Sequence, residues 1–192
     1  MPQTINVAVV IGSLRKDSIS RKTAQALARL APSHVKLQIA EIGDLEMFNE
    51  DVEAAGDTDS WKAFRKELRQ SDAVLFITPE YNRSVPGVLK NAIDVGSRPY
   101  GSSSWAGKPA AIISLSPGAI GAFGANHHLR QSLVFLDMPI LQQPEAYVGN
   151  ANSLFDDAGE LTSESTKDFF QSFVGTFANW IEQTRAETVP AE

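Results

Sequence analysis

The sequence contains no cysteine and no long apolar run. The absence of cysteine in these 192 residues excludes disulfides, thiolate nucleophiles and thiolate metal ligands. No apolar stretch approaches the roughly 20 residues that a membrane-spanning helix needs. The first residues, MPQTINVAVVIGS, have no positively charged start and too short an apolar run for a signal peptide. We therefore expect a cytoplasmic protein that does not insert into a membrane.

Positive charge is also scarce. The chain has 17 Lys and Arg against 23 Asp and Glu, a formal net charge of −6. This balance disfavours binding to nucleic acid or to anionic lipid. Two common nucleotide-binding loops are missing, because no G-x-x-x-x-G-K-[ST] occurs and no G-x-G-x-x-G follows the first apolar run. A small molecule is the partner that we expect, and not a triphosphate or dinucleotide held by the first turn.

Apolar runs and amphipathic segments alternate along the chain. Continuous apolar runs are typical of strands covered on both faces, and alternation of apolar and polar residues is typical of an edge strand. The predicted strands are Ile5–Ile11, 35–39 (an edge strand), 73–77, Ala110–Leu115, and a broken fifth strand from 139–141 and Ala146–Val148. The predicted helices are 23–30, 61–70, 88–95, a segment carrying Leu129, Leu133 and Leu136, and 162–184. Residues 43–59 are expected to be irregular.

This alternation predicts an α/β fold with five parallel strands and helices on both faces. We expect one domain over residues 1–192, with a frayed tail from about residue 186. In such sheets, ligands bind beyond the carboxyl ends of the strands. Three polar loops rich in Gly, Ser and Pro would meet there, namely 12–20, 79–86 and 116–124.

The first of these loops combines hydroxyls with one positive charge. Its sequence, VVIGSLRKDSISR, places Ser13, Ser18, Ser20 and Arg15 between a strand and the start of a helix. A helix N-terminus attracts anions, and an arginine fork suits a phosphate monoester. The loop is therefore a candidate phosphate site. The alternative, of similar weight, is that Ser18 or Ser20 only caps the helix and that Arg15 lies in solvent.

The other two loops can form the walls of a flat pocket. Backbone groups of residues 79–82 can read the edge of a heteroaromatic ring. Glu80 as a general base is disfavoured, because no second carboxylate or histidine lies near it in the sequence. In the third loop, Ser116, Pro117 and Gly118 form another wall or a plain strand-to-helix turn, and glycine allows a ligand close to the main chain.

Three further features have simple structural interpretations. His127 and His128 are adjacent and do not share a helix face, so we expect exposed side chains and no metal site. Asp94 and Arg98 are four residues apart, and we expect an ion pair at a helix end. Trp105 either shields a ligand or packs under a loop.

Four segments carry a family resemblance: GSLRKDSISR, TPEYNRSVPGVLKNAIDVGSR, AGKPAAIISLSPGAIG and LRQSLVFLDMP. In this order they resemble the NAD(P)H-dependent FMN reductase family, and its quinone and chromate reductase branch in particular. The similarity extends over about residues 5–183. The run PEYNxxxPGxLKNAID is the specific signal, whereas the serine loop alone is weak.

The resemblance implies a flavodoxin-like, three-layer, doubly wound fold with strand order 2-1-3-4-5 and a non-covalently bound FMN. The residues that it implies for the FMN phosphate are Ser13, Arg15, Ser18 and Ser20, with Ile19 between the last two. Those implied for the flavin ring are Pro79, Glu80, Tyr81, Asn82, Ser116 and Gly118. Arg83 and Ser84 are expected beside the substrate, with Arg83 assisting the NADPH phosphates.

The implied activity is electron transfer from NADPH or NADH through FMN to a quinone, or to a metal oxyanion such as chromate. No catalytic side chain and no metal are expected, because N5 of the flavin carries the chemistry. An electron-transfer flavodoxin is the alternative, although such proteins generally have a phosphate loop without arginine. A flavin-free response-regulator-like domain would have acidic residues where this chain has Gly12 and Ser13.

One position departs from the family pattern. The family commonly has GGxR in the third loop, where this chain has Gly121, Ala122, Phe123 and Gly124. The missing arginine often contributes to subunit contacts, with a partner that corresponds to Glu145. The resemblance implies a homodimer or homotetramer, and this departure leaves the choice between them open.

Overall fold

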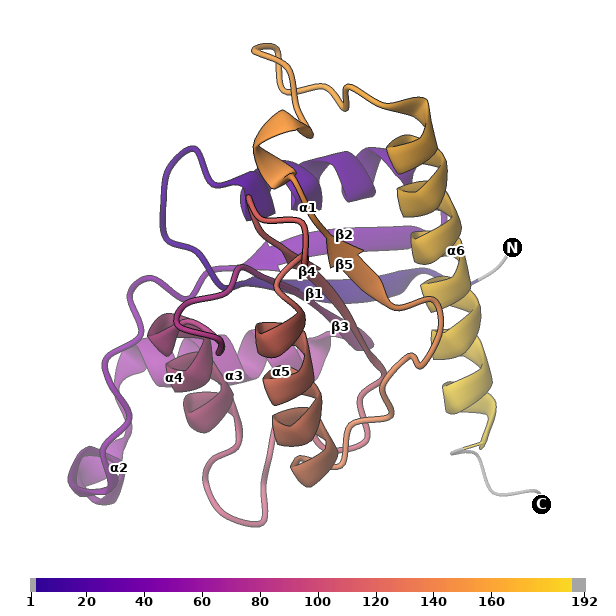
Figure 1. Cartoon of the computed structure of the whole chain (residues 1–192). Helices are drawn as coiled ribbons and strands as arrows, with labels where there is room; N and C mark the ends of the chain where they lie inside the picture. Colours follow the sequence, from indigo (N-terminus) through magenta and orange to yellow (C-terminus); the bar gives the residue numbers. More distant parts are fainter. Residues whose placement is uncertain (1–2, 188–192) are drawn as a thin grey trace.

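Five parallel strands form one sheet with the order β2-β1-β3-β4-β5, as the resemblance predicted (Figure 1). The structure, a computed structural model, describes residues 3–187. The strands are β1 (Ile5–Ile11), β2 (Val35–Ala40), β3 (Ala73–Thr78), β4 (Ala110–Leu115) and β5 (Ala146–Val148). The helices are α1 (Ile19–Leu30), α2 (Glu50–Gly56), α3 (Asp59–Gln70), α4 (Gly87–Gly96), α5 (Phe123–Phe135), the 3-10 turn η1 (Ala151–Ser153) and α6 (Glu164–Glu187).

The burial of the strands follows from this order. All residues of β3 and β4 are buried, because both strands lie inside the sheet and helices cover both faces. Strand β2 alternates in exposure, as predicted for an edge strand. The broken fifth strand was partly wrong. Its first half makes only an isolated bridge, between Ile140 and Ala110, and the ladder beside β4 is formed by β5 alone.

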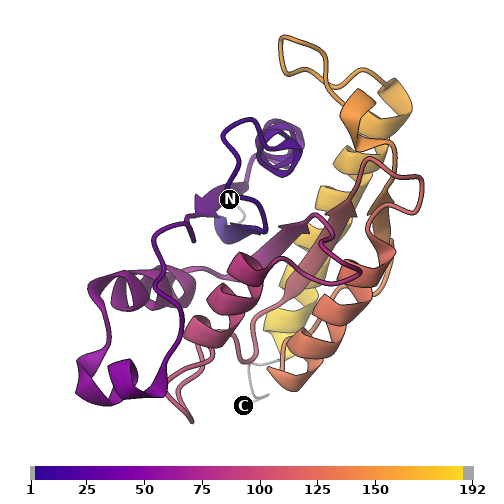
Figure 2. The ribbon, with the colours of Figure 1, turned by 60° about the vertical axis from the view of Figure 1, so that its left-hand side comes forward.

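Helices cover both faces of the sheet, with α6 and α1 on one side and α3, α4 and α5 on the other (Figure 2). Each face of the sheet therefore has its own hydrophobic core. In the first core, between the sheet and the helices α1 and α6, the side chains of Phe170, Phe173 and Phe177 come from α6. In the second core Trp105 is fully buried, and its indole N–H donates to the Ile93 carbonyl at 2.9 Å. Trp105 therefore packs in the core, which decides between the two interpretations of this residue.

Several boundaries and contacts differ from the predictions. Helix α1 begins four residues earlier than expected, at Ile19, and α2 lies within the segment expected to be irregular. The ion pair between Asp94 and Arg98 was wrong: Lys90 pairs with Asp94, and Arg98 reaches Glu53. Helix α6 continues to Glu187, and the rest of the tail expected to fray lies outside the described residues. Within residues 3–187, no helix is both long and apolar enough to cross a membrane.

Candidate functional site

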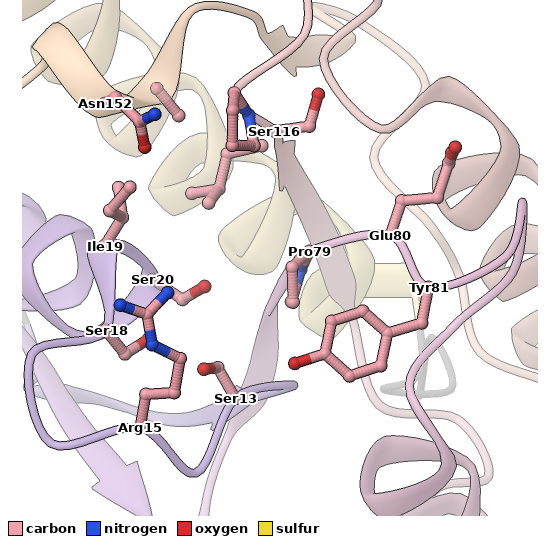
Figure 3. A pocket seen from close by; sticks show the side chains of 13 residues that line it. Ser13, Arg15, Ser18, Ile19, Ser20, Pro79, Glu80, Tyr81, Ser116 and Asn152 are labelled. Atoms are coloured by element: carbon pink, nitrogen blue, oxygen red, sulfur yellow. The ribbon is translucent and has the colours of Figure 1, made fainter.

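A pocket lies at the carboxyl ends of β1, β3 and β4, where the three polar loops were expected to meet (Figure 3). Its lining comes from four places in the chain. The lining residues are Ser13, Arg15, Ser18, Ile19, Ser20, Pro79, Glu80, Tyr81, Leu115, Ser116, Pro117, Ala151 and Asn152. The structure therefore brings together most of the predicted site residues. Asn82, Arg83, Ser84 and Gly118 are not among the lining.

Glycine at position 12 allows the end of β1 to lie against the end of β3. A Cβ there would lie 3.1 Å from Thr78 Oγ1, 3.2 Å from Pro79 Cδ and 3.3 Å from Leu89 Cδ2, closer than most real Cβ contacts. The Gly12 N–H donates to the Ile77 carbonyl at 2.9 Å. The first loop therefore leaves the sheet directly beside the second.

The start of α1 presents a concentration of donors to the pocket. Ser18 is the N-cap, and its hydroxyl oxygen accepts from the Arg21 N–H at 3.4 Å. Ser18 thus caps the helix, as the alternative interpretation predicted, and also lines the pocket. Ser18 and Ser20 are each 2% exposed. Among residues 3–187, the backbone N–H groups of Ile19 and Ser20 have no acceptor, which is typical of a helix N-terminus.

The two arginines near this helix start differ in their partners. Arg21 donates to both carboxylate oxygens of Glu41, at 2.8 and 2.7 Å. The hydrogen bond to Arg21 holds the pKa of Glu41 below its usual value. Arg15 is exposed, as the alternative interpretation predicted, and it also lines the pocket. It has no ion pair within the described part of the chain, and its guanidinium points toward the start of α1 (Figure 3). One arginine is committed within the protein, and the other is available to a ligand.

A tight turn forms the second wall. Tyr81 and Ser84 exchange two backbone hydrogen bonds, both 3.0 Å long. Asn82 and Arg83 between them have φ of 51° and 65°, as in a type I′ turn. Tyr81 is 55% exposed as a residue, and its ring extends into the pocket toward Ser13 (Figure 3).

Glu80 turns its carboxylate away from the pocket (Figure 3). Its Oε2 accepts the Ala125 N–H of α5 at 3.0 Å, and Arg83 Nη1 lies 3.5 Å from its Oε1. Next along the turn, the Ser84 hydroxyl lies 3.0 Å from His128 Nδ1. These contacts join the turn to α5. They give the Glu80 carboxylate a structural role, in agreement with the sequence analysis, which disfavoured Glu80 as a general base.

The loop after β4 forms the third wall of the pocket, and the turn η1 forms the fourth wall beside it. Ser116 follows β4, and its hydroxyl donates to the Gly118 carbonyl at 3.0 Å. The Ala151 N–H of η1 donates to the Ser116 carbonyl at 3.0 Å, which brings Asn152 to the rim. The residues of η1 were not predicted. The signal was weak but present, because the polar run 149–153 follows the last strand at the same edge of the sheet.

The two adjacent histidines differ in exposure and in partners: His128 is exposed, as expected, whereas His127 is half-buried, contrary to the prediction. His127 Nε2 lies 3.1 Å from the Tyr147 hydroxyl, and the His127 ring is 4.1 Å from that of Phe123. Burial raises the pKa of Tyr147, and a hydrogen bond with Glu145 adds to the rise. Among residues 3–187, no three His, Asp or Glu side chains come together as a metal site.

Comparison with known proteins identifies the family of this chain. The family model for NADPH-dependent FMN reductase matches residues 5–153. A quinone reductase of Pseudomonas putida is 64% identical over 186 residues, which cover 97% of this chain and all of the relative. The solved structure of FerB, a flavoenzyme NAD(P)H:(acceptor) oxidoreductase from Paracoccus denitrificans, is 44% identical with a TM-score of 0.87. It covers 94% of this chain and 99% of its own.

A more distant structure supports the fold alone. A single-residue mutant of a flavodoxin from Pseudomonas aeruginosa is 15% identical, with a TM-score of 0.59 over 93% of this chain and 99% of its own. The flavodoxin-like prediction is thereby confirmed. The family match spans most of the chain, and the relatives match over nearly its whole length. The chain belongs to the NADPH-dependent FMN reductase family, a family of oxidoreductases that use FMN and NAD(P)H.

Proposed function

We propose that this protein is an FMN-dependent NAD(P)H oxidoreductase whose acceptors are quinones. The family match and the quinone reductase at 64% identity support this assignment. The observation that carries it is the pocket itself, which joins an anion-attracting end at α1 to a more apolar end between the β3 and β4 loops. FMN has the same two ends, a phosphate and a flat ring system.

The residues at the α1 end fit a phosphate dianion. The N–H groups of Ile19 and Ser20 lack acceptors within residues 3–187, and the helix dipole favours negative charge there. The hydroxyls of Ser13, Ser18 and Ser20 add donors. Arg15 supplies a guanidinium with no competing carboxylate in the described part of the chain. These residues would hold the phosphate.

The other end fits a flat ring. Pro79, Tyr81, Leu115 and Pro117 contribute apolar surface, and Ser116 contributes a polar group at the edge. In this proposal, Asn82 and Gly118 contribute through the backbone of their turns, since neither residue is among those that line the pocket. When bound, FMN would supply the chemistry of hydride and electron transfer between NAD(P)H and the acceptor. The protein's part is to bind and orient.

Chromate forms a second acceptor class in this proposal, because the family resemblance extends to chromate reductases. A quinone takes up two electrons and two protons to become a hydroquinone, whereas a metal oxyanion takes single electrons. Steady-state assays with a benzoquinone and with chromate, each with NADPH and with NADH, test the two classes. A protein that reduces only the quinone would remove chromate from the proposal.

The defining experiment is an absorption spectrum of the purified protein, followed by anaerobic titration with NADPH. We expect a flavin spectrum, or its appearance when FMN is added, and rapid bleaching by NADPH alone. A flavodoxin that only carries electrons would bind FMN but would not be bleached without a separate reductase. A colourless protein that gives no calorimetric signal with FMN would contradict the proposal.

Assembly and location complete the proposal. A homodimer or homotetramer is supported by large apolar side chains on the surface of α5, since Val134 is 69% and Phe135 is 89% exposed. Light scattering of the purified protein tests this, and a monomer at micromolar concentration would contradict it. A cytoplasmic location, expected from the sequence, is part of the proposal and is tested by cell fractionation.

A further inference from the structure

The 79–84 turn is attached to α5 at two points, and neither attachment contributes directly to the pocket. Glu80 Oε2 accepts the Ala125 N–H at 3.0 Å. One helical turn further along, His128 Nδ1 lies 3.0 Å from the Ser84 hydroxyl. Ala125 and His128 are three residues apart and therefore lie on the same face of the helix. The turn consequently lies along the first two turns of α5.

Helix α5 has no N-terminal cap from its own sequence. Its N-cap residue is Ala122, which has φ of 61° and makes no side-chain hydrogen bond. The first N–H groups of a helix need external acceptors, and a carboxylate is favoured there by the helix dipole. Glu80 supplies this carboxylate from a loop 45 residues away in sequence. Its side chain is only 14% exposed, so little water is available to replace the contact.

The contact leaves no room for a side chain at position 124. A Cβ on Gly124 would lie 2.9 Å from Glu80 Oε2 and 2.8 Å from the Arg83 carbonyl oxygen. Both distances are below the 3.0 Å limit that real Cβ atoms observe. The Arg83 oxygen belongs to the backbone at the tip of the turn. It can yield only if the whole turn moves away from the helix.

The position of this turn matters to the pocket, because Pro79, Glu80 and Tyr81 line it. We infer that Glu80 is a positioning residue: its hydrogen bond to Ala125 fixes the wall that would face the flavin ring, and in this chain glycine at position 124 lets the turn approach α5 closely enough for that bond. This inference rests on the proposed FMN site. Glu80 touches neither substrate nor the reacting atoms in this role, but acts through the backbone of the turn.

Three single variants, one double variant and one control test the inference. Glu80→Ala removes the acceptor, Glu80→Gln keeps an oxygen that can accept the Ala125 N–H, and Gly124→Ala introduces the obstructing Cβ. Gly175→Ala in α6 is the matched control, because a Cβ there has no neighbour within 4 Å. Two quantities are measured in each: the hydrogen-exchange rate of the Ala125 amide by NMR without FMN, and the Kd for FMN.

We expect Glu80→Ala and Gly124→Ala each to speed exchange at Ala125, and to raise the Kd for FMN about tenfold, the effect of losing one net hydrogen bond. The Kd for FMN of Glu80→Gln is expected to stay within about threefold of the wild-type value. Gly175→Ala should have the wild-type Kd and the wild-type exchange rate at Ala125. The double variant Glu80→Ala/Gly124→Ala should lose no more affinity than either single variant, because both remove the same contact.

Two results would overturn the inference. Unchanged exchange at Ala125 in Glu80→Ala would show that the hydrogen bond does not form. Faster exchange with an unchanged Kd would show that the bond does not position the pocket wall. If the wild type binds no FMN, the proposed function fails, whereas the exchange rates still decide whether Glu80 holds the turn against α5.

Discussion

The two ends of the pocket use their polar groups in opposite ways. At the α1 end, Arg15 has no ion pair and the N–H groups of Ile19 and Ser20 have no acceptor within residues 3–187. At the turn after β3, the polar side chains already have partners in the protein: Glu80 contacts Ala125, and Ser84 contacts His128. One end is open to a ligand, and the other is held in place by the protein itself.

This difference indicates that the two ends of the pocket have different roles, one in affinity and the other in orientation. Free donors beside a helix N-terminus supply affinity for an anion, whose charge they match. Satisfied groups supply little affinity, but they fix the backbone, and a fixed backbone determines how a flat ring is oriented. Substitutions at the α1 end should therefore change how tightly FMN binds. Substitutions at the turn should act through geometry.

The largest effect is expected from Arg15→Ala. Loss of a charge-assisted hydrogen bond costs about 1–3 kcal/mol, which corresponds to roughly a 5- to 150-fold higher Kd for FMN. Quenching of FMN fluorescence during titration measures it. Lys16→Ala is the matched control, because Lys16 is exposed and does not line the pocket. If both variants raise the Kd for FMN equally, the phosphate is attracted by the overall positive charge of the loop and not by Arg15 in particular. The proposed difference between the two ends of the pocket would then be wrong.

The fold was predictable where burial dominates. Strands β3 and β4 are buried along their whole length, and their apolar runs have no other stable arrangement. Helix α2 was missed because it buries no residue, so its sequence carries no apolar stripe. It begins with a cap in which the Asn49 side chain accepts the Asp51 N–H at 2.8 Å. The first half of the expected fifth strand failed because Pro139 has no N–H to extend a ladder.

The site was predictable where strand ends carry its residues. The serine loop and the turn after β3 follow long apolar runs, so their convergence follows from the parallel sheet. The direction of the Glu80 side chain was not predictable, because it depends on the uncapped start of α5, which is close only in the folded chain. Asn152 was missed for a similar reason, since the hydrogen bond between Ala151 and Ser116 brings it to the rim.

Gly12→Ala tests the contact between the loop after β1 and the loop after β3. The added Cβ would crowd Thr78 and Pro79 at 3.1–3.2 Å, and overpacking of this kind costs about 1–3 kcal/mol of unfolding free energy. Urea denaturation measures the loss. Gly175→Ala serves again as the control and should raise stability by about 0.5–1 kcal/mol, as expected for a helix interior. If Gly12→Ala is as stable as the wild type, the loops after β1 and β3 are less closely joined than described.

Arg83→Ala should affect the nicotinamide substrate and leave FMN content unchanged. The Arg83 side chain is 75% exposed at the tip of the turn, and Glu80 is its nearest acid at 3.5 Å. An exposed charge that assists the NADPH phosphates is worth about 1 kcal/mol or less, a rise in KM of up to about fivefold. Arg83→Lys keeps the positive charge and should therefore have a KM for NADPH close to that of the wild type. An unchanged KM for NADPH in Arg83→Ala would remove the proposed role.

The smallest effect is expected from Glu41→Gln, which tests whether the second arginine at the start of α1 is structural. The pair is partly exposed, with side chains of Arg21 and Glu41 at 31% and 65%, so its loss should cost below about 1 kcal/mol of stability at pH 7. The pKa of Glu41 is lowered in the folded state by the hydrogen bond to Arg21. The unfolded state therefore binds more protons, and the stabilisation is present above the unfolded pKa and lost as the pH falls through the folded one.

Urea melts of the wild type and Glu41→Gln should accordingly differ at pH 7 and converge in acid, where the carboxyl is protonated in both states. The Kd for FMN should not rise in Glu41→Gln, because Arg21 is not among the residues that line the pocket. A weakened FMN affinity would instead place Arg21 in the anion-binding set. The two arginines would then share one role, and the α1 end would bind its ligand through a pair of charges and not through Arg15 alone.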